Sequence, residues 1–215
     1  MIFDPSTLDR SALNGLINGL VYPRPIAWVS TLSASGMPNL APFSFFNAFS
    51  FSPPTVAIGP GSRNGINKDT LRNCRETGEF VVSVVTEELA KLANATSGEF
   101  AADINEWDAL GVTCVESVAV KPKRVAQSPA AFECKVIHIV DLGAADSPTN
   151  SLVLGRVMRI HVDDAALDGT RPLSDALKLV GRMGGSEWCR TTDKFILPRP
   201  ANADPLDVRR ALDEG

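Results

Sequence analysis

The sequence lacks several features that would indicate a specific chemistry. It has only two histidines and four cysteines, and no two cysteines have the spacing of a CxxC motif or a zinc ribbon. His138 and His161 lie in alternating apolar runs, where a hydrogen-bonded strand residue is more common than a metal ligand. We therefore predict no metal site, and a Ser-His-Asp hydrolase has little support. The cysteines are expected to be reduced thiols that pack as small hydrophobic side chains.

The sequence also lacks long apolar runs and clustered positive charge. No stretch of 18 apolar residues occurs, the first ten residues do not resemble a signal peptide, and the net charge is −4. We expect no membrane insertion, no nucleic acid partner and a cytoplasmic location. With 215 residues, 44% of them hydrophobic, and no internal repeat or linker, the chain is predicted to form one domain over residues 1–215.

Short β-branched and aromatic runs, separated by Gly, Pro, Asn and Asp, dominate the middle of the chain. They predict a mostly β fold, an antiparallel barrel with peripheral helices, whose strands lie in 25–33, 39–52, 54–61, 79–85, 111–120, 131–140 and 151–162. Helices are predicted over 67–78, which Gly78 ends, and over 86–98, which Thr86 caps and Gly98 ends. Weaker helical patterns cover 5–19, 172–181 and 205–213.

The run 39–52 has the composition of a ring-binding surface. Four of its phenylalanines share one parity with Ala41, which predicts a single strand with this face buried and Phe46 on the opposite face. Pro42 cannot donate a ladder hydrogen bond, so it predicts a strand edge or bulge. Ser44 and Asn47 add polar groups among the aromatic residues, a mixture that suits a planar heteroaromatic ligand. Core packing is the alternative role for each phenylalanine.

The loop GSRNGINKDT (61–70) precedes a predicted helix and carries Arg63 and Lys68. Unpaired N–H groups and the positive dipole end of a helix N-terminus favour a phosphate. The loop matches neither GxxxxGK[ST] nor GxGxxG, so neither a P-loop nor a Rossmann site is indicated. The residues alone indicate a barrel that binds a phosphorylated aromatic cofactor. A terminal phosphomonoester fits best here, although a solvated surface loop has the same composition.

Several motifs in fixed order resemble the flavin reductase-like family of FMN-binding split barrels, with antiparallel Greek-key topology. These motifs are Arg24-Pro25, Val29-Ser30-Thr31, Asn39-x-Ala41-Pro42-x-Ser44-x-Phe46, Pro53-Pro54, Lys68-Asp69-Thr70 and Gly181-Arg182-Met183-Gly184-Gly185. The similarity extends over about residues 20–200. It implies a homodimer with one FMN in each of two clefts, and hydride transfer from NADH or NADPH to the flavin. Because the loop 61–70 suits a terminal phosphomonoester, we expect FMN and not FAD.

The resemblance also implies which residues contact the cofactor. The predicted contacts are Ser30 and Thr31 with the ribityl chain or phosphate, Ala41, Pro42, Phe43, Ser44, Phe45, Phe46 and Asn47 with the ring, Ser62, Arg63, Lys68, Asp69 and Thr70 with the phosphate, and Arg182 and Trp188 at the mouth of the site. No catalytic side chain is assigned, because the flavin supplies the redox chemistry. Relatives often have Tyr where this chain has Trp188. The alternative role for Trp188 is that of a packing anchor on the barrel.

Three other functions remain open at this stage. A flavin-binding electron carrier or sensor would use the same site without steady-state turnover. A pyridoxamine-phosphate-oxidase-like enzyme has similar phosphate and ring requirements, and related barrels bind heme or corrinoids. The leading prediction is an NAD(P)H-dependent flavin reductase, with a flavin-dependent monooxygenase as a further expected partner.

Overall fold

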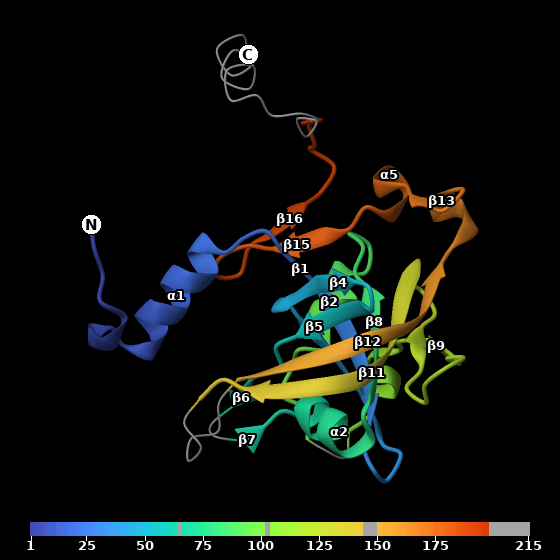
Figure 1. The fold of residues 1–215 in the computed structure, drawn as a ribbon, viewed down its shortest axis with the longest axis horizontal. Helices are drawn as coiled ribbons and strands as arrows, with labels where there is room; N and C mark the ends of the chain where they lie inside the picture. The colour runs from blue at the N-terminus through green and yellow to red at the C-terminus, as the bar shows by residue number, and fades with distance from the viewer. Residues whose placement is uncertain (64–65, 102–103, 144–149, 198–215) are drawn as a thin grey trace.

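The centre of the molecule is one antiparallel sheet of seven strands (Figure 1). The computed structural model describes residues 1–63, 66–101, 104–143 and 150–197. The strand order is β3-β2-β8-β11-β12-β5-β4, with bounds β2 Ala27–Leu32, β3 Pro38–Phe43, β4 Phe46–Phe51, β5 Pro54–Ile58, β8 Glu79–Val84, β11 Ala130–Asp141 and β12 Ser151–Val162. The prediction of a mostly β, antiparallel fold is confirmed.

The run 39–52 forms two strands, β3 and β4, and not the single predicted strand. They lie at opposite edges of the sheet, and Ser44 and Phe45 form the corner between them. The prediction of one buried aromatic face is wrong beyond Phe43, because Phe45, Phe49 and Phe51 are 44%, 62% and 93% exposed. Alternation continues through the corner, so the pattern gives no sign that the chain changes edges.

Pro42 lies in β3, where Trp28 of β2 is its only strand neighbour. Since β3 is an edge strand, the missing N–H of Pro42 interrupts no central ladder. The edge position predicted from this proline is confirmed.

Helix α2 (Asp69–Thr77) closes one side of the barrel. Its Leu71 and Cys74 join a buried cluster with Phe80 and Val153 from the sheet. Gly78 ends the helix with a φ of 70°, a left-handed conformation that glycine adopts without strain. The predicted helix over 67–78 and its glycine stop are confirmed.

The other predicted helices are shorter than their patterns suggested. Helix α3 covers only Ala90–Ala95, although Thr86 accepts a hydrogen bond from the N–H of Leu89 (3.3 Å). Residues 5–19 give a 3-10 helix η1 (Pro5–Thr7) and α1 (Arg10–Leu20), and 172–181 gives α5 (Ser174–Leu177) followed by a strand. Residues 205–213 lie outside the described residues. Helix α4 (Glu106–Leu110), begun by the side chain of Asn105, was not predicted.

Short elements complete the fold. They are β1 (Arg24–Pro25), β15 (Val180–Arg182) and β16 (Trp188–Arg190) in one small sheet, the pairs β6 (Ser62–Arg63) with β7 (Ile66–Asn67), β9 (Cys114–Val115) with β10 (Arg124–Val125), and β13 (Leu167–Asp168) with β14 (Arg171–Pro172), and the 3-10 helix η2 (Asp164–Ala166). Helix α1 projects from the barrel beside the small sheet (Figure 1). Among the described residues, no helix has the length and apolar character needed to cross a membrane.

All four cysteines are free thiols. Cys74 and Cys134 are buried, and burial raises the pKa of Cys74 to about 12, so this thiol stays protonated and unreactive. Cys114 is exposed, and the prediction of a core role is wrong there because β9 is a short surface strand.

Candidate functional site

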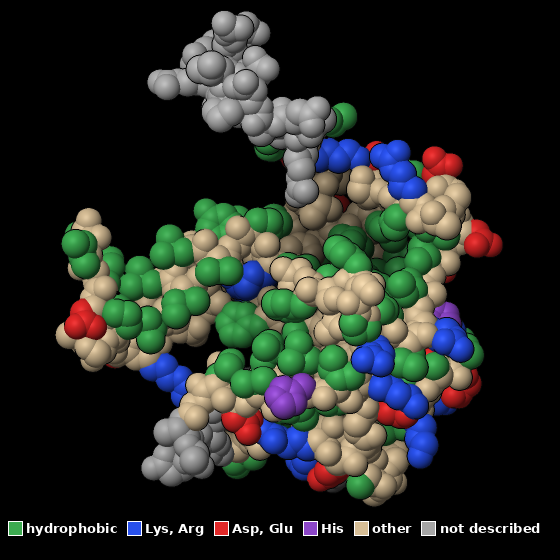
Figure 2. Space-filling view, in the orientation of Figure 1, with side chains coloured by type: hydrophobic (Ala, Val, Ile, Leu, Met, Phe, Trp, Pro, Cys, Tyr) green, Lys and Arg blue, Asp and Glu red, His purple; other side chains and the backbone are tan. Residues whose placement is uncertain are grey.

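A cleft of about 890 Å³ lies between helix α1 and the barrel. Figure 2 shows this face of the molecule hollowed between the two. The volume falls within the range of roughly 300–1,000 Å³ that small-molecule and cofactor sites have. The walls come from α1, β1, the β3–β4 corner, the segment 59–68 and the small sheet, and they include Arg10, Asn14, Asn18, Arg24, Ile26, Gly59, Gly61, Asn94, Ser97, Asn150 and Gly185.

The structure brings many of the sequence-predicted site residues into this cleft. Those that line it are Pro42, Phe43, Ser44, Phe45, Ser62, Lys68, Arg182 and Trp188. They come from three separate parts of the chain, namely the β3–β4 corner, the loop before α2 and the C-terminal strands. An aromatic surface and cationic side chains therefore face one cavity, as the sequence predicted.

Ser30, Thr31 and Thr70 do not line the cleft. The Ser30 hydroxyl donates to the carbonyl of Lys123 (2.5 Å). Thr31 Oγ1 accepts from Asn73 Nδ2 (3.0 Å), and Thr70 Oγ1 accepts from the Asn39 amide (3.0 Å). The hydroxyls of Thr31 and Thr70 stabilise the packing of α2 against β2 and β3, and that of Ser30 holds the segment before β10. The contact of these three residues with a cofactor stays a prediction.

Four more of the predicted residues, Ala41, Phe46, Asn47 and Asp69, also lie outside the cleft lining. Asp69 forms an ion pair with Arg72 (2.5 Å) in the first turn of α2. The positive end of the helix dipole favours an acidic side chain at this position. Ala41 and Phe46 pack against the core, and Asn47 Oδ1 accepts from the N–H of Ala48 (2.8 Å). The side chain of Arg63 lies outside the described part of the chain. Their roles at the cofactor stay predictions as well.

Every charged residue known to line the cleft, within the described part of the chain, is positive. Arg10, Arg24, Lys68 and Arg182 line it, and none of its described lining residues is Asp or Glu. A concave, partly apolar wall strengthens the field of these side chains, because it excludes water from them. The cleft therefore favours an anionic ligand.

Two of the cations lie against aromatic rings. The Lys68 ammonium is 5.4 Å from the centroid of Phe43, and the Arg182 guanidinium is 5.4 Å from the centroid of Trp188. Lys68 directly precedes α2, which begins without a side-chain cap. Flat apolar surface and positive charge therefore occur together at two places in the cleft, a combination that suits an aromatic ligand with an acidic group.

Arg24 is a cleft residue to which the sequence analysis gave no role. Only 7% of it is exposed. Its Nη1 donates to the carbonyls of Asn18 (2.8 Å) and Val21, its Nη2 to that of Met183 (2.9 Å), and its Nε to Ser44 Oγ (3.3 Å). Arg24 thus joins the end of α1, the β15–β16 turn and the β3–β4 corner, three walls of the cleft.

The paired glycines 184 and 185 serve the turn between β15 and β16. A Cβ on Gly184 would come within 3.3 Å of the Cα of Gly19, so α1 packs closely on this turn. Gly185 has a φ of 55°, which disfavours other residues. The paired glycines therefore allow the sharp turn between β15 and β16, and the close approach at Gly184 is to α1.

The position of Trp188 is compatible with both of the roles considered for it, and its contact with a cofactor stays a prediction. It lines the cleft, and it also packs partly buried against a core cluster that includes Trp28 and Trp107. Its half-buried position means that the two roles are not alternatives.

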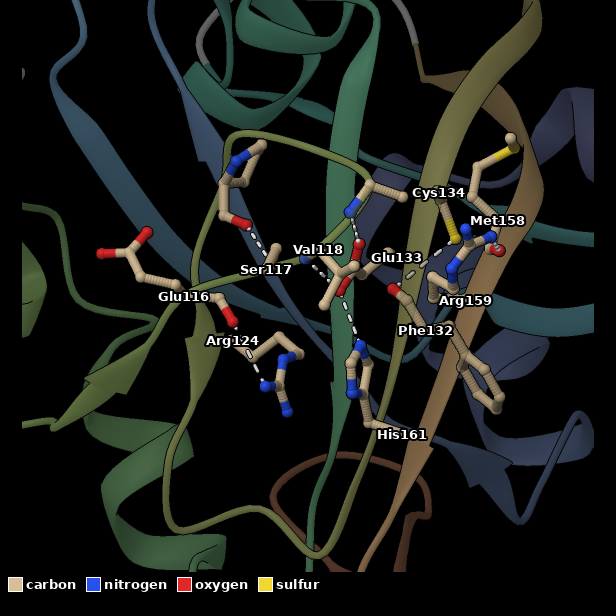
Figure 3. A network of polar contacts seen from close by, with 12 residues as sticks. Glu116, Ser117, Val118, Arg124, Phe132, Glu133, Cys134, Met158, Arg159 and His161 are labelled. Atoms are coloured by element: carbon tan, nitrogen blue, oxygen red, sulfur yellow. Dashed lines mark hydrogen bonds and ion pairs between the residues drawn. The ribbon is translucent and has the colours of Figure 1, made fainter.

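A second buried polar cluster lies away from the cleft (Figure 3). Glu133 in β11 is fully buried and accepts from the N–H groups of Val118 (2.8 Å) and Ala119 (2.5 Å). His161 Nε2 lies 2.6 Å from Glu133 Oε1. Burial alone would raise the pKa of Glu133, but these hydrogen bonds and His161 outweigh it and lower the pKa. His161 is a hydrogen-bonded strand histidine, as predicted.

Comparisons with known proteins agree with this architecture. Residues 19–177 match the model of the flavin reductase like domain. The uncharacterized protein YwrF of Bacillus subtilis is 36% identical over 203 residues, which cover 93% of this chain and 99% of YwrF. The arrangement of strands is the split barrel of solved flavin reductases.

Two solved structures are similar over nearly the whole chain. Nitrilotriacetate monooxygenase component B from Bacillus cereus has a TM-score of 0.89 at 29% identity, covering 92% of this chain and 98% of its own. The 2-nitrobenzoate 2-nitroreductase NbaA of Pseudomonas fluorescens has a TM-score of 0.84 at 32% identity, covering 94% and 97%. With the family model matching most of its length and a split-barrel fold, the chain belongs to the flavin reductase-like domain family.

Proposed function

We propose that the cleft binds FMN and that the protein is an NAD(P)H-dependent flavin reductase. The observation that carries the proposal is a cleft of about 890 Å³ with aromatic walls, four cationic side chains and no acidic side chain among its described lining residues. FMN combines a planar ring with a phosphate dianion, so it matches both properties. A neutral aromatic ligand would make no use of the cations.

The residues of the cleft divide between the two parts of FMN. Ser62 and Lys68 lie together in the segment before α2 and would hold the phosphate. Phe43 and Phe45 would contact the ring system, and the Ser44 hydroxyl, which accepts from Arg24 Nε, would orient a polar ring atom. When bound, the flavin accepts a hydride from a reduced nicotinamide at N5 and passes the electrons on.

The protein's contribution is to orient the reactants and exclude water. The cleft would need no acid or base from the protein, because the bound flavin would supply the redox chemistry. Arg24 fixes three walls of the cleft relative to one another. The reacting rings would therefore meet in a site that is already organised.

A homodimer is part of the proposal. Phe49 and Phe51 of the edge strand β4 are largely exposed, and so are Ile17 and Leu20 of α1. Figure 2 shows hydrophobic side chains along α1 on this face. A second copy of the chain would cover them, since exposed apolar surface of this kind marks interfaces. Sedimentation should give twice the chain mass of 23.0 kDa.

A charged variant tests this interface. Phe49→Asp should give a monomer, whereas Met37→Asp, at an exposed residue of the β2–β3 turn, should remain dimeric. A monomeric wild-type protein at micromolar concentration would contradict the homodimer.

Two names among the structural relatives suggest where the electrons go. One relative is named as a monooxygenase component and the other as a nitroreductase. Supply of reduced flavin to a monooxygenase is the acceptor reaction we favour, and reduction of a nitroaromatic acid is the second candidate. An electron carrier without steady-state turnover is the third.

The absorption spectrum of the purified protein tests the proposal directly. Protein loaded with FMN should have flavin absorption bands that disappear when NADH or NADPH is added without oxygen. A yellow protein that neither nicotinamide reduces would favour the carrier. Failure to bind FMN at all would contradict the whole assignment.

A further inference from the structure

Two arginines lie side by side at one end of the cleft. Arg24 of β1 and Arg182 of β15 are direct partners in the antiparallel ladder, so their side chains leave the same face of the small sheet. Both line the cleft. Arg24 donates to three carbonyls and the Ser44 hydroxyl, and Arg182 donates to the carbonyl of Gly185 (2.6 Å). Within the described part of the chain, neither forms an ion pair with a carboxylate.

This pair of like charges is unfavourable for the protein alone. Arg24 is almost fully buried, and neutral acceptors satisfy its hydrogen bonds without neutralising its charge. Burial and the charge of Arg182 both lower the pKa of Arg24. An anion placed between or beside the guanidinium groups would offset both effects.

The arginine pair is separate from the end of the cleft that we assign to the flavin phosphate. In Figure 1, β15 and β16 lie above the barrel, whereas β6, β7 and the start of α2, near Lys68, lie below it. FMN has one phosphate, and Ser62 and Lys68 already account for it in the proposed function. The pair is therefore available for an acidic group of a second molecule.

We propose that the Arg24–Arg182 end of the cleft binds an anionic oxygen group, phosphate or carboxylate, of the molecule that exchanges electrons with the flavin. This inference rests on the proposed function. Arg182, which is only half-buried, makes the contact, and Arg24 is a positioning residue that holds the turn carrying Met183. The Trp188 ring beside Arg182 offers a flat surface for an adjoining ring.

Two sources of the anionic group are distinguishable. One is the diphosphate of the hydride donor, NADH or NADPH, and the other is an acidic group on the electron acceptor. To test the donor, NADH is compared with N-benzyl-dihydronicotinamide, which donates a hydride but has no phosphate. To test the acceptor, naphthoquinone sulfonate is compared with naphthoquinone, which has no charge.

The experiment compares Arg182→Gln with the wild-type protein, both loaded with FMN. We expect the KM for NADH, or for naphthoquinone sulfonate, to rise about tenfold while kcat changes little. The KM for the matched neutral compound should not change. Arg182→Lys should recover part of the loss, because it keeps the charge but not the planar fork. Arg190→Gln is the matched control, since Arg190 lies in the same small sheet, pairs with Glu87 and does not line the cleft.

Calorimetric titration with NAD⁺ and with naphthoquinone sulfonate measures the same contact without turnover. In Arg182→Gln the affinity for NAD⁺, for naphthoquinone sulfonate or for both should fall about tenfold, while the FMN affinity and the thermal midpoint stay unchanged. The inference would be overturned if the variant bound both anions as tightly as the wild-type protein does. It would also be overturned if the variant lost as much affinity for the neutral compounds as for the charged ones. If no donor reduces the wild-type flavin, the proposed function fails, while the titration still decides whether the arginine pair binds anions.

Discussion

Glu133 and Arg24 are both buried and charged, but their charges are compensated to different degrees by the groups around them. Glu133 accepts from two backbone N–H groups and lies beside His161, so its charge is compensated within the barrel. Arg24 is surrounded by neutral oxygens and by a second arginine. Removal of a compensated buried charge destabilises the fold, because its partners are left buried and unpaired. An uncompensated buried charge beside a cleft marks a candidate ligand site. Variants of each region should therefore change different measurements.

The largest expected effect is on stability, at the compensated site. Glu133→Ala removes the acceptor of the Val118 and Ala119 N–H groups and should lower the free energy of unfolding by about 3–5 kcal/mol. FMN affinity per folded molecule should not change, because Glu133 does not line the cleft. Denaturant titration and a flavin binding assay measure the two effects. Glu116→Ala, in an exposed ion pair with Lys123, is the control and should cost less than about 1 kcal/mol.

In the cleft, we expect a substitution to weaken FMN binding and to leave the stability of the protein nearly unchanged. Lys68→Ala should weaken FMN binding by about 1–3 kcal/mol through loss of a charge-assisted hydrogen bond, with little change in stability. Fluorescence titration of the flavin measures the affinity. Lys91→Ala on the exposed face of α3 is the matched control. Unchanged affinity in both Lys68→Ala and Arg63→Ala would contradict the phosphate assignment.

Trp188 belongs to both regions and should give a mixed result. Trp188→Ala should change the nicotinamide KM or the FMN affinity roughly tenfold, about 1.4 kcal/mol. It should also destabilise the protein by less than the roughly 3–5 kcal/mol of a fully buried aromatic residue, because Trp188 is half-buried. A loss of stability with unchanged kinetics would remove Trp188 from the site.

The smallest effect is a pH dependence of the compensated site. The pKa of Glu133 is lower in the folded protein than in the unfolded chain, so its stabilising contribution is complete above the ordinary carboxyl pKa of about 4.3. The contribution is lost as pH falls below that value, through the folded pKa. Glu133→Gln should therefore flatten the acid limb of the stability curve. An identical acid limb in wild type and variant would show that other carboxylates dominate.

Alternation, turn residues and caps predicted the fold well where local rules decide. Gly78 and the apolar stripe of α2 identified that helix, and Pro42 identified an edge strand. The corner at Ser44 and Phe45 could not be predicted, because residues on both sides keep the same alternation. The short helix α4 has too few residues for its period to stand out.

The site was predictable only in part. Lys68 and Phe43 could be found because their residue types suit a phosphate and a ring. For Ser30 and Thr31 the residue type does not decide the role, since a hydroxyl that suits a ligand suits a buried carbonyl or amide equally well. Their contact with the cofactor stays a prediction. Arg24 was missed because its importance lies in which distant carbonyls it meets, and spacing along the chain does not contain that information.

The β3–β4 corner has a consequence for the motions of the barrel. Ser44 and Phe45 carry the chain from one edge of the seven-stranded sheet to the other, and the cleft is lined by Pro42 and Phe43 of β3 and by these two corner residues. A ligand in the cleft therefore touches the edge strand β3 and the corner from which β4 begins. Local opening at the corner releases the ligand, so binding makes that opening less favourable by RT ln(1 + [L]/Kd). When the flavin is present, the backbone amides of β3 and β4 that flank the corner should therefore exchange their hydrogens more slowly. The exchange rates of the two strands should fall by a similar factor, because the strands open together.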